Sequence, residues 1–79
     1  MNLEYIIQDL KKFFSEHLNI NLNNIRDDSL IIEELGADSL TLVDLSVYIE
    51  DTYKIVLDER FFLQNISSIK SVAEKILLE

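Results

Sequence analysis

Ser39 is the side chain of this chain whose position best suits chemistry. It follows Gly36, the only glycine, and Asp38, and it precedes a helix-forming run over residues 41–53. A glycine just before such a run is typical of a loop that turns into a helix. The Ser39 hydroxyl would then lie at the N-terminal end of the helix, where backbone N–H groups lack partners and the dipole is positive. A phosphate esterified to this hydroxyl is favoured there, so the position suits a phosphodiester better than a nucleophile.

A catalytic role for Ser39 would require a base beside it. The only histidine is His17, and no feature of the sequence places it near Ser39. The sequence around Ser39 also lacks the second glycine of a nucleophile elbow. With no cysteine and a single histidine, the chain has no recognisable metal site and no thiol of its own. We therefore expect neither catalysis nor metal binding.

The sequence Leu-Gly-Ala-Asp-Ser-Leu at residues 35–40, followed by Val43, Asp44 and Leu45, resembles the attachment motif of acyl carrier proteins. The resemblance covers nearly the whole chain. It implies that Ser39 carries a 4′-phosphopantetheine arm, whose thiol holds acyl intermediates as thioesters in fatty acid, polyketide or related biosynthesis. It also implies two kinds of partner: the phosphopantetheinyl transferase (holo-acyl-carrier-protein synthase) that attaches the arm, and acyl-loading, condensing and modifying enzymes.

Length and charge limit the other possibilities. Seventy-nine residues are enough for a single domain, 1–79, without a large active-site cleft. Fifteen acidic against seven basic residues give a net charge of −8, which disfavours nucleic acid and anionic membranes as partners. No basic-then-apolar leader and no apolar run of about 20 residues is present, so we expect a soluble, cytoplasmic monomer without a membrane span.

The first half of the chain predicts one helix and one long loop. Apolar residues at spacings of three and four predict an amphipathic helix over residues 3–17, capped by Asn2. Residues 19–37 are rich in asparagine and predict a loop pinned by buried aliphatic side chains. A short helical turn over residues 30–35, capped by Asp28 or Ser29, is expected within this loop.

The helix that begins near Ser39 has two different faces. Its core face is predicted to contain Leu42, Leu45, Ile49 and Tyr53. A second strip combines acidic and aliphatic side chains, and we expect it to dock basic patches of partner enzymes. From charge alone, a merely solvated face is the alternative. The predicted docking residues are Asp38, Leu40, Val43, Asp44, Val47, Glu50 and Asp51.

The last third predicts a short helix and a final long one. Asp58 or Glu59 starts a turn that contains Phe61 and Phe62, a pair not expected in acyl carriers, which either packs inward or forms a partner patch. Ser67 or Ser68 caps the last helix. Its inward residues are predicted to be Ile69, Val72, Ala73, Ile76 and Leu77. The predicted fold is therefore all-α, a small antiparallel four-helix bundle like that of acyl carrier proteins, with three main helices and one short helix.

Two other functions remain open. A peptidyl or aminoacyl carrier would use the same arm, but such carriers tend to have a second glycine and often a histidine before the serine. Ala37 and Asp38 resemble the acyl carrier pattern instead. A helical interaction module without an arm would explain the fold and the charge, but not the residues that coincide at the start of an acidic helix, namely Gly36, Asp38, Ser39 and Leu40.

Overall fold

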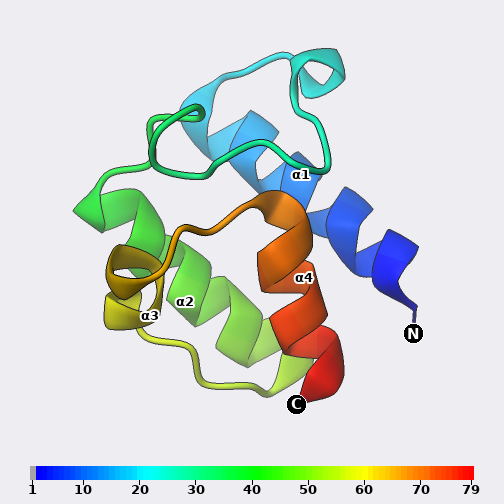
Figure 1. The fold of residues 1–79 in the computed structure, drawn as a ribbon, viewed down its shortest axis with the longest axis vertical. Coiled ribbons are helices and arrows are strands. Elements are labelled where there is room, and N and C mark those ends of the chain that lie inside the picture. The colour runs from blue at the N-terminus through cyan, green and yellow to red at the C-terminus, as the bar shows by residue number, and fades with distance from the viewer. Residues whose placement is uncertain (1) are drawn as a thin grey trace.

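The computed structural model describes residues 2–79, and every regular element in that range is helical (Figure 1). The elements are α1 (Leu3–Leu18), the 3₁₀ helix η1 (Leu22–Asn24), α2 (Ser39–Tyr53), α3 (Glu59–Gln64) and α4 (Ile69–Leu78). Three helices are long and α3 is short. The predicted all-α class and the order of the helices are confirmed.

Helix α1 forms where the apolar spacing predicted it. The Asn2 side chain accepts a hydrogen bond from the Tyr5 backbone N–H at 2.8 Å, which satisfies one of the unpaired donors of the first turn. The helix ends at Asn19, whose φ of 56° is the left-handed conformation common after a last helical turn. Its buried stripe consists of Ile6, Ile7, Leu10, Phe13 and Phe14.

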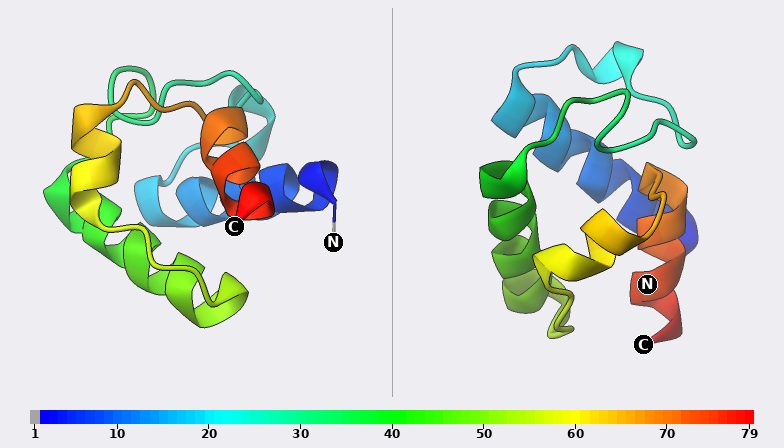
Figure 2. Two further views of the ribbon diagram at one scale, coloured as in Figure 1. Left: turned by 60° about the horizontal axis from the view of Figure 1, so that its bottom comes forward. Right: turned by 60° about the vertical axis from the view of Figure 1, so that its left-hand side comes forward.

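The helices pack in pairs around one core. Helix α4 crosses α1, and α3 lies beside α2, which runs back roughly opposite to α1 (Figures 1 and 2). The side chains that fill the space between them are aliphatic and aromatic. The largest fully buried ones are Phe14, Phe62, Ile6, Leu10, Ile31, Leu42, Leu45, Ile49, Ile69 and Val72.

A carboxylate on α1 accepts hydrogen bonds from two tyrosines of α2. The Tyr48 hydroxyl donates to one oxygen of Asp9 at 2.6 Å, and the Tyr53 hydroxyl donates to the other at 2.5 Å. Burial, and then the hydrogen bond to Asp9, raise the pKa of Tyr48 to about 12, and the pKa of Tyr53 is raised for the same reasons. Both phenols therefore remain protonated donors at neutral pH.

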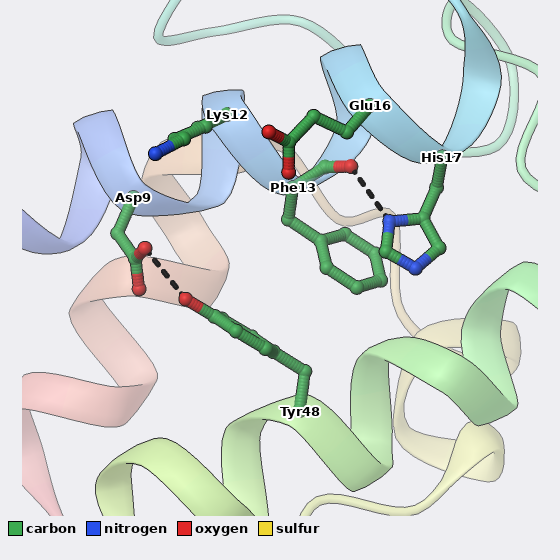
Figure 3. Close-up of a pocket in the computed structure, with 6 residues that line it drawn as sticks. All are labelled: Asp9, Lys12, Phe13, Glu16, His17 and Tyr48. Atoms are coloured by element: carbon green, nitrogen blue, oxygen red, sulfur yellow. Dashed lines mark hydrogen bonds between the residues drawn. The ribbon is translucent and has the colours of Figure 1, made fainter.

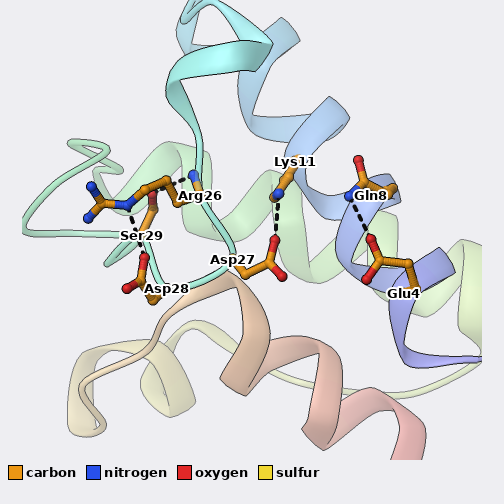
Figure 4. Close-up of polar contacts among 7 residues, drawn as sticks. All are labelled: Glu4, Gln8, Lys11, Arg26, Asp27, Asp28 and Ser29. Carbon is orange, nitrogen blue, oxygen red and sulfur yellow. Dashed lines mark hydrogen bonds and ion pairs between the residues drawn. The ribbon is translucent and has the colours of Figure 1, made fainter.

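The long loop between α1 and α2 is ordered by the start of α4. The backbone N–H groups of Ile31, Ile69 and Lys70 donate to the carbonyls of Ser67, Ser29 and Asp27 at 2.9, 3.1 and 2.8 Å. Lys11 on α1 pairs with the Asp27 carboxylate at 2.5 Å (Figure 4). These contacts hold the loop over one end of the helices, so it needs little regular structure of its own.

The loop differs from its prediction in three respects. Residues 30–35 do form a turn, but its first N–H, that of Leu30, donates to the Glu34 side chain at 2.7 Å. The expected caps are used elsewhere: the Ser29 hydroxyl accepts from the Arg26 N–H, and the Asp28 carboxylate pairs with the Arg26 side chain (Figure 4). The 3₁₀ helix η1 within the loop was not predicted, and its aliphatic residue Leu22 is 45% exposed, so it is not among the buried side chains that pin the loop.

Helices α3 and α4 begin at the predicted caps. The Asp58 side chain accepts from the Arg60 N–H, and Ser68 forms a capping box with Ser71. Leu77 is 46% exposed, so its predicted inward position is wrong. It lies at the edge of the apolar stripe, where the last turn of α4 has no neighbour to cover it.

The structure also shows how Phe61 and Phe62 are oriented. Phe62 is fully buried, whereas Phe61 is partly buried and packs against the core. The two rings meet edge to face, with centroids 5.3 Å apart. Phe62 is thus the main anchor of the short helix α3, and the pair does not form an outward patch.

We predict that Phe62→Ala lowers the free energy of unfolding by about 3–5 kcal/mol, because it leaves a cavity where α3 meets the core. Phe61→Ala should cost clearly less, because part of that ring is already in contact with water. Urea unfolding followed by circular dichroism measures both values. An equal cost for the two variants would contradict the assignment of Phe62 as the anchor.

Candidate functional site

Asp38 defines the start of α2. Its carboxylate accepts hydrogen bonds from the backbone N–H and the hydroxyl of Thr41, both at 3.0 Å, while its carbonyl accepts from the Leu42 N–H. The backbone bond, and then the hydroxyl bond, lower the pKa of Asp38 below its ordinary value of 3.8. Asp38 is therefore an ionised N-cap at neutral pH.

Gly36 turns the chain into this cap. Its φ is +77°, a conformation that L side chains rarely adopt, and a Cβ built on it would meet no atom within 4 Å. Backbone conformation alone, and not space, therefore requires glycine here. The next residue, Ala37, is buried and its N–H donates to the Ile31 carbonyl at 3.1 Å, so the chain is fixed immediately before α2.

Ser39 is the first residue of α2, and it is exposed. No group among residues 2–79 forms a hydrogen bond with its hydroxyl in the structure. The other serines are partly or fully buried, and each side chain is used in a local hydrogen bond. Those serines are Ser15, Ser29, Ser46, Ser67, Ser68 and Ser71. Ser39 is thus the only exposed serine among residues 2–79.

The Asp38 carboxylate uses one of the first-turn donors of α2, because it accepts from the Thr41 N–H. A phosphate on Ser39 would therefore lie beside a negative group at this end of the helix.

Within residues 2–79, no hydrogen bond joins the Ser39 hydroxyl to a side chain that could act as a base. Nδ1 of His17 is engaged with the Phe13 carbonyl at 3.0 Å on α1, and no hydrogen bond joins Ser39 to His17. Within residues 2–79, no group of three or more acidic, histidine or cysteine side chains is arranged to hold a metal ion. In the same range, no helix has the length and apolar character that a membrane span requires.

The acidic side chains on the outer face of α2 are not neutralised. Asp44, Glu50 and Asp51 are exposed. The four ion pairs of the described chain all use other acids, namely Asp27, Asp28, Asp58 and Glu79. Lys54, the first basic residue after the strip, donates to the Asp51 backbone carbonyl at 2.9 Å. The outer face of α2 therefore carries exposed carboxylates without an ion-pair partner among the described residues.

Aliphatic side chains accompany these acids. Leu40, Val43 and Val47 are 71%, 43% and 55% exposed, although Leu42, Leu45 and Ile49 already fill the core face of the same helix. Helix α2 thus has two apolar faces, of which one is buried in the core and the other is exposed to water. An exposed apolar face of this kind is typical of an interaction surface. Three further aliphatic side chains on or beside α3 are exposed, and the sequence did not predict this, because short segments show no clear apolar period. They are Val56, Leu63 and Ile66.

Comparison with known proteins agrees with this geometry. Residues 8–76 match the family described as "Phosphopantetheine attachment site". This chain belongs to the acyl carrier protein family. The acyl carrier protein of Phytoplasma mali (strain AT) is 35% identical over 71 residues, which cover 90% of this chain and 83% of the relative. That of Thermotoga maritima is 32% identical over 73 residues, 92% of this chain and 89% of the relative.

The prosthetic group of this carrier family is 4′-phosphopantetheine, which supplies a thiol that the carrier's own sequence lacks. The residues present fit such a group. An exposed, unbonded hydroxyl at the start of a capped helix can bear a phosphodiester without disturbing any packed side chain. The family consists of carriers.

We predict that the charge of Asp38 stabilises the carrier only above its depressed pKa. Because the folded pKa lies below the ordinary value of 3.8, the stabilisation is complete above that value and is lost as the pH decreases through the folded pKa. Asp38→Asn keeps a neutral cap, so its melting temperature should be below that of the wild type at about pH 6, and the difference should narrow as the pH decreases from the ordinary pKa through the folded one. A constant difference across that range would contradict a charge-assisted cap.

Proposed function

We propose that this chain is an acyl carrier domain, residues 1–79, in which Ser39 receives the 4′-phosphopantetheine arm. The observation that carries the proposal is that Ser39 is the only exposed serine and stands at the capped start of α2. A phosphopantetheinyl transferase attaches the arm, so the carrier is a substrate and not a catalyst. The arm then holds acyl intermediates as thioesters.

We predict that Ser39→Ala abolishes attachment without loss of fold. The side chain faces water and has no bonded partner, so the melting temperature should remain within about 1–2 °C of the wild type, as for a neutral surface change. Intact mass after incubation with coenzyme A and a transferase measures the attachment. Ser46→Ala is the matched control and should still gain one arm. Attachment to the Ser39→Ala protein would refute the assignment.

The outer face of α2 is the proposed docking surface. Asp38, Asp44, Glu50 and Asp51 steer basic patches of partners, and Leu40, Val43 and Val47 supply the apolar contact between the acids. The absence of ion pairs to the exposed acids of α2 supports this role, because these carboxylates remain available to a partner. Asp38 has a second task as the cap, so its substitution would affect the fold as well as docking.

We predict that Asp44→Lys/Asp51→Lys slows attachment of the arm about tenfold at low salt, mainly through association, because complementary charge accelerates encounter. The deficit should shrink at high salt, where exposed charges are screened. Glu4→Lys/Glu74→Lys changes the net charge equally on α1 and α4 and should retain most of the rate. If the arm is attached to the two double variants at equal rates, the acidic strip is a solvated face and not a docking surface.

The partner enzymes determine which acyl group the carrier holds. Fatty acid, polyketide and related pathways remain the proposed setting, and a peptidyl or aminoacyl carrier is the alternative. Mass spectrometry of the thioester on the protein from its native host distinguishes them. The monomeric state and the cytoplasmic location expected from composition remain predictions, and size-exclusion chromatography with light scattering tests the first.

A further inference from the structure

A small pocket lies at the seam between α1 and α2, apart from Ser39. It is lined by Asp9, Lys12, Phe13, Glu16 and His17 of α1 and by Tyr48 of α2 (Figure 3). Its volume of about 190 Å³ is below the roughly 300 Å³ at which pockets begin to hold drug-sized ligands. A single side chain of another protein fits this size better than a free metabolite.

Three aromatic rings line this pocket, and hydrogen bonds fix two of them. The His17 ring stacks on Phe13, with centroids 3.9 Å apart and planes inclined by 22°, and Nδ1 of His17 is fixed to the Phe13 carbonyl. The Tyr48 ring lies 5.3 Å from Phe13 and is held by its bond to Asp9. Preformed flat walls reduce the entropic cost of binding a planar group.

The charges at the rim select a cation and its position. No described group forms a hydrogen bond or ion pair with the Glu16 carboxylate, which lies above Phe13 in Figure 3. Asp9 already accepts from two tyrosines, and Lys12 points toward the Asp9 end. At the Asp9 end the Lys12 ammonium offsets the carboxylate, so the unpaired Glu16 carboxylate is the main attraction for a bound cation.

We propose that this pocket binds an arginine side chain of a partner protein. A guanidinium stacks on aromatic faces and pairs with a carboxylate through two parallel bonds, which an ammonium cannot do. Tyr48 lies four residues after Asp44 and three before Asp51, so the pocket adjoins these acids on α2. The inference deepens the proposed docking function: it extends the docking surface from α2 onto α1 and names the residue type that it receives.

The test uses N-acetyl-arginine amide as the probe and the unmodified protein as the receptor. His17 is the only histidine, so its ring resonances report binding without overlap. We expect saturable shifts with the arginine probe, weaker binding of N-acetyl-lysine amide, and no specific shift with the uncharged N-acetyl-citrulline amide. Equal shifts with the citrulline and arginine probes would overturn the proposal. Because Ser39 takes no part, this result is independent of whether Ser39 accepts the arm.

Two substitutions should act in opposite directions. Glu16→Gln should weaken arginine binding about threefold, and Lys12→Gln should strengthen it by a similar factor, as expected for single exposed charges. Glu74→Gln and Lys70→Gln are the matched controls on α4, with the same changes of net charge. If each variant binds like its control, the effect is one of overall charge and the pocket is not the site.

Discussion

The hydrogen bonds between Asp38 and Thr41 fix where α2 begins, and the rest of the molecule is arranged around that point. The bond to the Thr41 backbone closes the first turn, and the bond to its hydroxyl anchors the cap against the core, because Thr41 is itself buried. The residue after the cap, Ser39, is thereby left in water. A single capped turn thus combines a fixed backbone with an accessible hydroxyl, which a carrier requires if enzymes must reach its cargo.

Helix α2 is held by different chemistry on its two sides. Toward α1, the Asp9 carboxylate bonds to Tyr48 and Tyr53, and these directional bonds fix the relative position of the two helices. Toward α3, the contact depends on burial of Phe62, and no side-chain hydrogen bond joins the two helices in the described structure. The contact between α2 and α3 is therefore apolar, whereas the contact with α1 also includes directional hydrogen bonds.

Much of this architecture could be predicted from the sequence, because its signals are local. Apolar spacing over a few turns indicated the three long helices, and capping side chains lie within three residues of the groups that they bind. The exposure of Ser39 depends on a glycine and a cap within the same short segment, so the candidate site was predictable for the same reason. The acidic face of α2 was predictable because residues three and four apart lie on one side of a helix.

Tertiary structure alone decided which faces meet. Asp9 is 44 residues from Tyr53, and nothing in the spacing of either helix indicates that a carboxylate of one accepts from the phenols of the other. The same holds for the burial of Phe62 rather than Phe61, for the exposure of Leu77, and for the seam pocket at Glu16. Periodicity shows that a helix has an apolar side, but the neighbour that covers it is selected by packing between segments distant in sequence, where the core is filled with the least strain.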